Sequence, residues 1–349
     1  MNDCTDSKAA VYIGVDLHKR YSTVVRKDVH GNVLERQHRI NHTPDELAEF
    51  VGSLDENCRI AVEATGNWYY FYETVEATGA EVILSHPLKT RAIASARIMT
   101  DDISADVLAD LLRADLVAKS YIPDRATRDR RELLRFRAAL VSMTTQVRCR
   151  LRAVLTKNGL DCPHADILGP SSRRFLAAAT LRDTYRTEVD SLCRIGQHFM
   201  AETERVQLLI DQEAQQDERA QLLITIPGVG PYTALLILAE IGDIGRFSTP
   251  GHLASYAGLV PSVHASGGHT RLGHITKQGS KWLRWILVEC WWKLINKSPT
   301  CRRFYDRIAD KHGPKVARVA LARKLIHIIY HMLTKRVPFC EGGTTPASS

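Results

Sequence analysis

The chain has 349 residues, 44% of them hydrophobic and 25% charged, a balance typical of a folded globular protein and long enough for two domains. Its longest apolar runs are too short or too interrupted by polar groups to span a bilayer, and we expect a cytoplasmic protein with no membrane contact. The net charge of +8 favours a polyanionic partner, while the absence of any Cys-x-x-Cys pair argues against a zinc knuckle.

The N-terminal third predicts alternating strands and helices. The apolar run in AVYIGVDLHK ends at Asp16, and two more strand patterns follow, joined by a turn that contains Gly31 and Asn32. The next predicted elements are a helix over residues 43–54, a strand over 58–63, a helix over 67–79 and a strand over 80–87. This order, closed by a further helix, matches an α/β mixed sheet of the RNase H type.

Three acids fall at related places in that fold. Asp16 ends the first strand, Glu63 ends the fourth, and the helix MTDDISADVLADLL follows the fifth. The first and fourth strands of an RNase H-like sheet are neighbours, so both carboxylates could converge with one from the helix. Such a set suits Mg²⁺, which takes hard oxygen ligands and, as a pair of ions, supports phosphodiester transfer. The alternative is a set of isolated acids and the solvated face of an amphipathic helix.

Residues 124–160 predict one long helix with an apolar seam and an arginine-rich exterior. Arg130, Arg131 and Arg135 are candidates for contacts with nucleic-acid phosphates. The alternative is a coiled-coil arm for oligomerisation with a basic exterior, and both interpretations can hold together. Residues 173–220 continue as helix and suit a spacer or a dimer arm.

A second domain is predicted from about residue 220. LLITIPGVGPYTALLILAEIGD predicts a helix, a tight turn and a helix, the pattern of a helix-hairpin-helix. Gly228 and Gly230 would let backbone amides approach a phosphate closely. An ordinary helical hairpin with glycine at its turn is the alternative.

The segment 256–289 places Ser266 before two glycines and among several cations. A serine needs a base or a cationic field to become a nucleophile, and glycines allow a phosphate to approach it. Arg271 and Lys277 are candidates to stabilise the charge on that phosphate. The alternative is a common flexible turn. The tryptophans on the following helix are expected in the core rather than as base-stacking platforms: Trp282, Trp285, Trp291 and Trp292.

Several ordered motifs together resemble one family. They are YIGVDLHK, VEATGNW, TDDISADVLADLLRADL, IPGVGPYTA, YAGLVP and SGGHTRLGHITKQGSKWLR, and they extend over nearly the whole chain. The chain is similar to the DEDD-type transposases of bacterial insertion sequences, insertion-sequence family one hundred and ten, which are related to the pilin-gene invertase Piv. By position in these motifs, Asp16, Glu63 and Asp101 match the family's first three acids and Ser266 matches its serine nucleophile.

The resemblance implies a RuvC-like nuclease domain over residues 1–123, a helical connector over 124–219 and a C-terminal transposase domain over 220–340. It also implies a serine that becomes covalently linked to DNA, a noncoding bridge RNA that pairs with donor and target DNA, and a homo-oligomer, a dimer or a tetramer. The family's helix pattern TDxxDA places a fourth acid three residues after the third, where this chain has Ser104. Asp102 and Asp106 are possible substitutes.

These observations predict an RNA-guided DNA recombinase that cuts and rejoins strands through a phosphoserine at Ser266, with metal held by Asp16, Glu63 and Asp101. One alternative is a junction-resolving nuclease that uses the same acids with water as nucleophile. Another is a nucleic-acid-binding protein that has lost catalysis, for which Ser104 is the main support.

Overall fold

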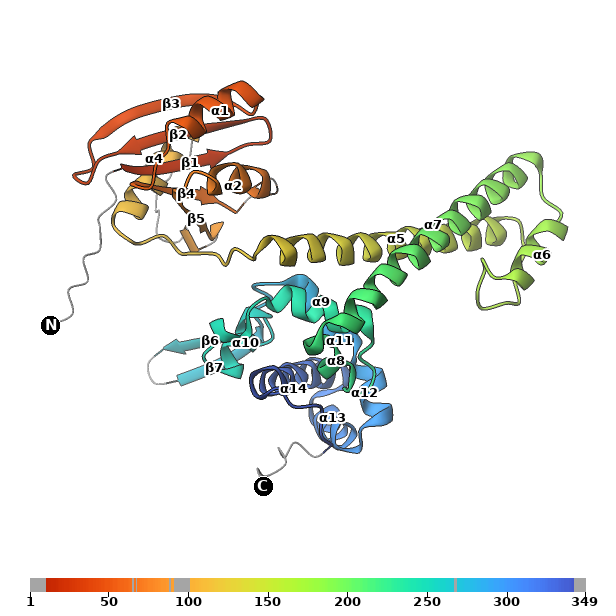
Figure 1. Cartoon of the computed structure of the whole chain (residues 1–349). Helices are drawn as coiled ribbons and strands as arrows, with labels where there is room; N and C mark the ends of the chain where they lie inside the picture. The colour runs from red at the N-terminus through yellow and green to blue at the C-terminus, as the bar shows by residue number, and fades with distance from the viewer. Residues whose placement is uncertain are drawn as a thin grey trace. The chain divides into compact units, whose positions relative to one another are not determined.

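The computed structural model describes residues 11–64, 66, 68–87, 89–90, 101–266 and 269–341 (Figure 1). The chain divides into two compact units, Met1–Ile122 and Pro123–Ser349. Within the described ranges, no helix is long and apolar enough to cross a membrane.

The first unit is built on a mixed five-stranded sheet. Its strands lie in the order β3-β2-β1-β4-β5, with β2 antiparallel to both β1 and β3, and with β1, β4 and β5 parallel. The strands are β1 (Val11–Leu17), β2 (Tyr21–Lys27), β3 (Val33–Asn41), β4 (Cys58–Glu63) and β5 (Glu81–Ser85). The prediction that the first and fourth strands are neighbours is confirmed.

Alternation along the strands divides the sheet into two faces. Val15 and Val62 face a core that also contains Phe50 of α1 (Pro44–Gly52) and Phe71 of α2 (Trp68–Glu76). The opposite face packs against α4 (Asp101–Arg113), which buries Leu108 in a cluster that includes Tyr12 and Ala61. Successive side chains of a strand point to opposite faces, so residues two apart share a face. The sheet therefore lies between α1 and α2 on one side and α4 on the other (Figure 1).

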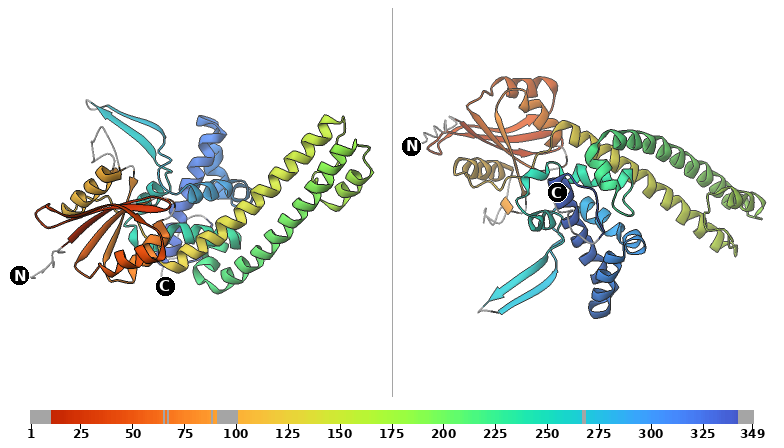
Figure 2. Two further views of the ribbon diagram at one scale, coloured as in Figure 1. Left: turned by 90° about the horizontal axis from the view of Figure 1, so that it is seen from above. Right: turned by 60° about the horizontal axis from the view of Figure 1, so that its bottom comes forward.

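The second unit contains two long helices that pack along each other, α5 (Arg125–Lys157) and α7 (Asp183–Gln216) (Figure 2). At 1.5 Å per residue, each is about 50 Å long. α6 (Pro170–Ala178) lies at the far end of this pair, over a small core. Most of the predicted apolar seam is covered within the chain itself. Five of its seven residues are buried, Leu134, Leu140, Val147, Leu151 and Leu155, while Leu133 and Val141 are not.

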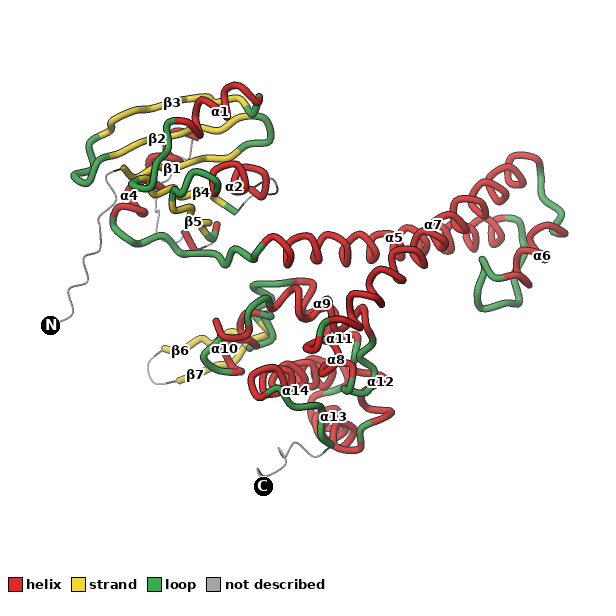
Figure 3. Tube along the Cα trace, in the orientation of Figure 1, coloured by secondary structure: helices red, strands yellow, loops and turns green. Residues whose placement is uncertain are grey.

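The remaining helices form one helical body, in which α9 is buried along nearly its whole length. They are α8 (Glu218–Ile224), α9 (Pro231–Ile241), η1 (Ile244–Arg246), α10 (Pro250–Tyr256), α11 (Lys281–Glu289), α12 (Trp291–Lys297), α13 (Pro299–His312) and α14 (Pro314–Lys335). A two-stranded ribbon, β6 (Pro261–Ser266) and β7 (His269–Ile275), extends from this helical body (Figure 3).

The tryptophans do not all lie in the core as expected. Trp285 is 41% exposed and Trp292 is 57% exposed, whereas Trp282 and Trp291 are half-buried. The expectation was wrong for the two exposed residues because the core takes up the opposite side of these helices. Leu283, Ile286 and Leu294 are the residues buried there.

Candidate functional site

Asp16 and Glu63 occupy adjacent positions on neighbouring parallel strands. The register of β1 and β4 pairs Val15 with Val62, and the two acids are the next residue on each strand. Parallel strands lie about 4.8 Å apart. By strand alternation from Tyr12 and Ala61, both acids belong to the face covered by α4. The sheet thus brings two carboxylates together at the carboxyl ends of β1 and β4.

The course of α4 brings its first turn to the same edge. Its last residue, Arg113, lies near Gly31 in the β2–β3 turn, and its middle crosses β1 at Gly14 beside Ala105. Going back from Ala105 to Asp101 covers about 6 Å along the helix. Going from Gly14 to Asp16 covers about 6.6 Å along the strand. Asp101 therefore lies at about the same distance beyond the α4–β1 crossing as Asp16 does. Its side chain lies outside the described part.

The donor set suits a hard divalent cation. Asp16 has a side chain only 14% exposed, with one carboxylate oxygen 3.8 Å from His18 Nε2. Among the side chains that the structure describes, no group of three His, Cys, Asp or Glu residues forms a metal site, and Asp101 and Asp102 are not in that set. Two carboxylates from strands and the first turn of a helix at one edge fit the oxygen ligands that such ions require.

The two flanks of α4 separate Ser104 from Asp106. Ser104 lies one turn before Leu108, on the flank that packs toward Ala61 of β4. Asp106 lies on the other flank, where one carboxylate oxygen accepts from Lys27 Nζ at 3.0 Å and the other from Arg36 Nη2 at 2.8 Å. These ion pairs commit Asp106 to β2 and β3, so its placement does not support a role as substitute metal ligand.

Lys27 is a residue that sequence reasoning missed. Its side chain is 5% exposed, and its amine bonds Asp110 at 2.7 Å as well as Asp106. A buried ammonium without carboxylate partners would be costly, so these bonds hold two successive turns of α4 against β2. Lys27 thereby fixes where the first turn of α4 lies. The signal in the sequence was a lysine at the end of the strand YSTVVRK, at a position where alternation from Val25 predicts a buried side chain.

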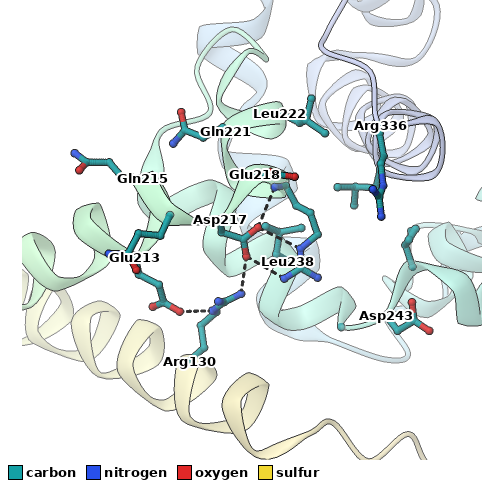
Figure 4. A pocket seen from close by; sticks show the side chains of 15 residues that line it. Arg130, Glu213, Gln215, Asp217, Glu218, Gln221, Leu222, Leu238, Asp243 and Arg336 are labelled. Carbon is teal, nitrogen blue, oxygen red and sulfur yellow. Dashed lines mark hydrogen bonds and ion pairs between the residues drawn. The ribbon is translucent and has the colours of Figure 1, made fainter.

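The three predicted phosphate-binding arginines bind protein groups instead. Arg130 bonds Glu213 at 2.6 Å and Asp217 at 3.2 Å, as Figure 4 shows. The cavity beside them, about 1060 Å³, is lined by four acids and three arginines, which gives it no excess of positive charge for a polyanion. Arg131 is buried and donates to the carbonyl oxygens of residues 239 and 240. Each of these guanidinium groups therefore has a structural partner.

Arg135, Glu240 and Ser280 form an anchor for the N-terminus of α11, the helix that follows the β6–β7 ribbon. Arg135 donates to Glu240 Oε1 at 2.8 Å, while Ser280 Oγ donates to Glu240 Oε2 at 2.7 Å. Glu240 is 2% exposed, on the otherwise apolar α9. Ser280 caps α11 immediately after the ribbon and its return loop. A lone acid within LLILAEIG was the available signal, since a buried carboxylate needs charged or polar partners.

The base of the ribbon is fixed by close backbone packing. Thr276 N donates to Val260 O at 2.9 Å, and Lys277 N donates to Gly258 O at 3.2 Å. Gly279 has a φ of +86°, and a Cβ there would lie 2.0 Å from Tyr256 O, so only glycine fits. Lys277 itself has a φ of 54° and an exposed side chain.

Ser266 is the last residue of β6 and pairs in register with His269 of β7. Its side chain lies outside the described part, as do those of residues 263–272. Arg271 pairs with His264, two positions from the Ser266 pair, whereas Lys277 lies beyond the Pro261–Ile275 pair at the ribbon's base. Ser266 is five strand residues, about 17 Å, from Pro261 at the base of the ribbon. Lys277, which follows the partner of Pro261, is therefore far from Ser266 within one chain.

The PGVG turn joins α8 and α9, as the sequence pattern predicted. Gly228 has a φ of +91°, and a Cβ there would lie 2.3 Å from Cβ of Lys293. Gly230 precedes α9, which begins with Pro231 and has no side-chain cap in the described structure. Residues 224–230 line a cavity of about 420 Å³ together with Lys293 and Lys297, so the turn faces two cations.

Two family models match separate stretches of the chain. A transposase model of the IS110 DEDD type matches residues 13–158, and the IS116/IS110/IS902 transposase family model matches residues 220–306. The first stretch contains the strand acids and α4, and the second contains the PGVG turn and the ribbon.

Two of the relatives that match over nearly their full length are insertion-sequence transposases. The chain is 26% identical over 339 residues to the transposase for insertion sequence element IS1328 of Yersinia enterocolitica, covering 94% of this chain and 98% of the relative. It is 26% identical over 350 residues to the transposase for IS1111A of Coxiella burnetii, covering 95% and 92%. It is 36% identical over 134 residues to the pilin gene-inverting protein of Moraxella bovis, covering 38% and 42%.

Proposed function

The chain belongs to the IS110 family of insertion-sequence transposases, enzymes that cut and rejoin DNA, and from this premise we propose that it transfers DNA strands through Ser266. Asp16, Glu63 and Asp101 assist that transfer. The observation that carries the proposal is the meeting of β1, β4 and the first turn of α4 at one edge of the sheet. We assign this domain to the RuvC-like nucleases.

The three acids are our candidate ligands for Mg²⁺, in line with the divalent-metal dependence that a DEDD-type family suggests. When bound, the cation supplies Lewis-acid stabilisation of charge on the scissile phosphate and the leaving oxygen. Ser104 removes one negative charge from the family's pattern, on the flank of α4 that packs toward β4. We propose that the three acids suffice, with Asp102 as the nearest further carboxylate in the sequence.

In the proposed transfer, Ser266 Oγ attacks the phosphorus of a scissile phosphodiester. The Oγ–P bond forms as the bond from phosphorus to the leaving strand's oxygen breaks, the serine gives up its proton, and the leaving oxygen accepts one. The resulting phosphoserine keeps a phosphodiester linkage, so attack by a hydroxyl of another strand rejoins DNA and releases the serine. Arg271, two register positions away, is our candidate to offset charge on the phosphate.

Further parts of the proposal concern binding and assembly. We propose that the PGVG turn acts as a helix-hairpin-helix, with Gly228 and Gly230 close to a DNA phosphate, and that Lys277 contacts the DNA backbone rather than the reacting phosphate. A bridge RNA encoded by the element would select the DNA. Exposed apolar side chains on α7, Leu208 and Leu209, support assembly of several copies.

For the domain boundaries we keep residues 1–123, 124–219 and 220–340 as a proposal. The middle region corresponds to the long helices α5 and α7 with α6, which form a continuous structural arm. Buried contacts from Arg131 and Arg135 to α9 join this arm to the helical body.

A covalent adduct on a denaturing gel tests the mechanism directly. The protein is incubated with Mg²⁺, RNA transcribed from DNA flanking the gene, and DNA carrying the element junction. We expect an adduct from the wild type and none from Ser266→Ala or Asp16→Asn. Cutting without an adduct, retained in Ser266→Ala, would indicate a nuclease that uses water. An adduct only from Ser104→Asp would show that the missing acid had disabled this chain.

A further inference from the structure

α11 and α12 present two exposed tryptophans. The two helices are separated by a single turn residue, Cys290, which is bonded to both of them: Cys290 N donates to Ile286 O, and Leu294 N donates to Cys290 O. Trp285 and Trp292 are seven residues apart, which is close to two turns and about 10 Å along the axis. With 41% and 57% of their surfaces exposed, both indoles are open to solvent.

Each exposed ring packs against a neighbouring tryptophan. Trp285 packs edge to face on Trp282 with centroids 5.8 Å apart, and Trp292 does the same on Trp291 at 5.3 Å. Trp291 in turn stacks on Tyr305 at 5.7 Å. Side chains braced in this way lose little further freedom when a ligand covers them, which favours binding.

Cations lie on the neighbouring side of α12, where Lys293 and Lys297 are about 100° and 140° around the helix from Trp292. Lys293 and Lys297 are exposed on α12 and line the cavity at the PGVG turn. Lys281, one helical turn before Trp285, is exposed as well. Rings for stacking beside cations for phosphates make up the surface with which proteins bind unpaired nucleic-acid strands. In a duplex the base faces are already stacked, so exposed indoles have little to bind there.

We propose that the surface of α11 and α12 that carries Lys281, Trp285, Trp292, Lys293 and Lys297 binds an unpaired DNA strand. Its bases stack on the indoles and its phosphates lie at the lysines beside the PGVG turn. DNA is the occupant because the chain belongs to a DNA-cutting family and because three exposed lysines outnumber the one exposed acid there, Glu289. The inference rests on the proposed function, which it deepens by naming the form of DNA that is held.

Binding of a labelled oligo(dT) strand by the full chain tests this, with fluorescence anisotropy and tryptophan quenching as readouts. We expect Trp292→Ala to weaken binding about 5- to 150-fold, the effect of losing one base stack. Trp292→Phe should recover most of the affinity because it keeps a ring. Phe136→Ala removes a ring that is 50% exposed on α5 and is the matched control, with no expected effect.

Charge is tested separately through salt dependence. Lys297→Gln should reduce the slope of log affinity against log salt by about 0.7, the value for one phosphate contact on a single strand. The proposal is overturned if Trp292→Ala binds oligo(dT) like the wild type, if it loses duplex and single strand equally, or if the loss is confined to oligo(U). The binding assay needs no strand transfer, so its failure is distinct from the absence of a Ser266 adduct.

Discussion

Gly14→Ala tests whether close packing of α4 on the sheet positions the acid site. A Cβ at position 14 would lie 1.9 Å from Ala105 O and 2.6 Å from Ala109 N, both of them backbone atoms. Ordinary contact begins at 3.4 Å, so α4 would have to retreat by about 1.5 Å. Overpacking of this kind costs about 1–3 kcal/mol of unfolding free energy. Because Asp101 lies one turn from Ala105, the same retreat moves it relative to Asp16.

Misplacement of a reacting group by about 1 Å can lower a rate about 100-fold. We therefore expect metal-dependent cleavage by Gly14→Ala to fall by about that factor while the protein still folds at low temperature. Cleavage of junction DNA and urea unfolding measure the two effects. Gly52→Ala is the matched control, since Gly52 ends α1 and a Cβ at that position would meet nothing within 4 Å. Equal stability and equal cleavage in the two variants would refute the packing argument.

Three further predictions concern charged groups. Asp106→Asn should lower the unfolding free energy by about 1–3 kcal/mol because it breaks hydrogen-bonded ion pairs, while the metal concentration for half-maximal cleavage stays unchanged; a large rise in that concentration would instead make Asp106 a ligand. Glu240→Gln should reduce adduct formation by about 10-fold or more through a displaced ribbon, whereas Glu132→Gln, an exposed partner of the same arginine, should not; a folded Glu240→Gln with a normal adduct yield would contradict the anchor. Burial raises the pKa of Asp217, but hydrogen bonding and charge from Arg219 outweigh it and lower that pKa below 3.8. Its stabilising effect is thus complete above about pH 4 and lost as the pH falls through the lowered pKa, so urea unfolding of Asp217→Asn should converge with the wild type only in acid.

The sheet was predictable because its strands are marked locally. Apolar runs of strand length, the Gly31 turn and the Thr43 cap with Pro44 each determine a boundary from adjacent residues. The β6–β7 ribbon was missed, although a Gly-Gly pair between PSVHAS and HTRLGHI is a hairpin signal. The many cations in that segment were interpreted as a binding site, and the strand pattern on either side of the glycines was not considered.

The partners of charged residues could not be predicted in the same way. Arg130, Arg131 and Arg135 share a helix rich in cations, and their sequence neighbours do not show that acids and carbonyl oxygens about 80 to 110 positions away accept from them. Asp106 and Ser104 differ by two positions, yet a helix turns about 200° between them, which puts them on different flanks of α4. Which flank faces β4 depends on tertiary packing.

In each unit, a buried charged residue positions the segment that carries proposed catalytic residues. Lys27 holds α4, which begins with Asp101, and Glu240 holds the cap of the helix that follows the Ser266 ribbon. Desolvation makes buried ion pairs poor sources of net stability, and apolar residues of similar size often replace them without loss. These buried ion pairs instead fix how helices and strands are oriented, because a carboxylate that accepts from two donors holds the two elements carrying those donors in place. We therefore expect the double variant Glu240→Met with Arg135→Met to have a melting temperature at least as high as that of Glu240→Gln. Its yield of covalent adduct should be no higher than that of Glu240→Gln.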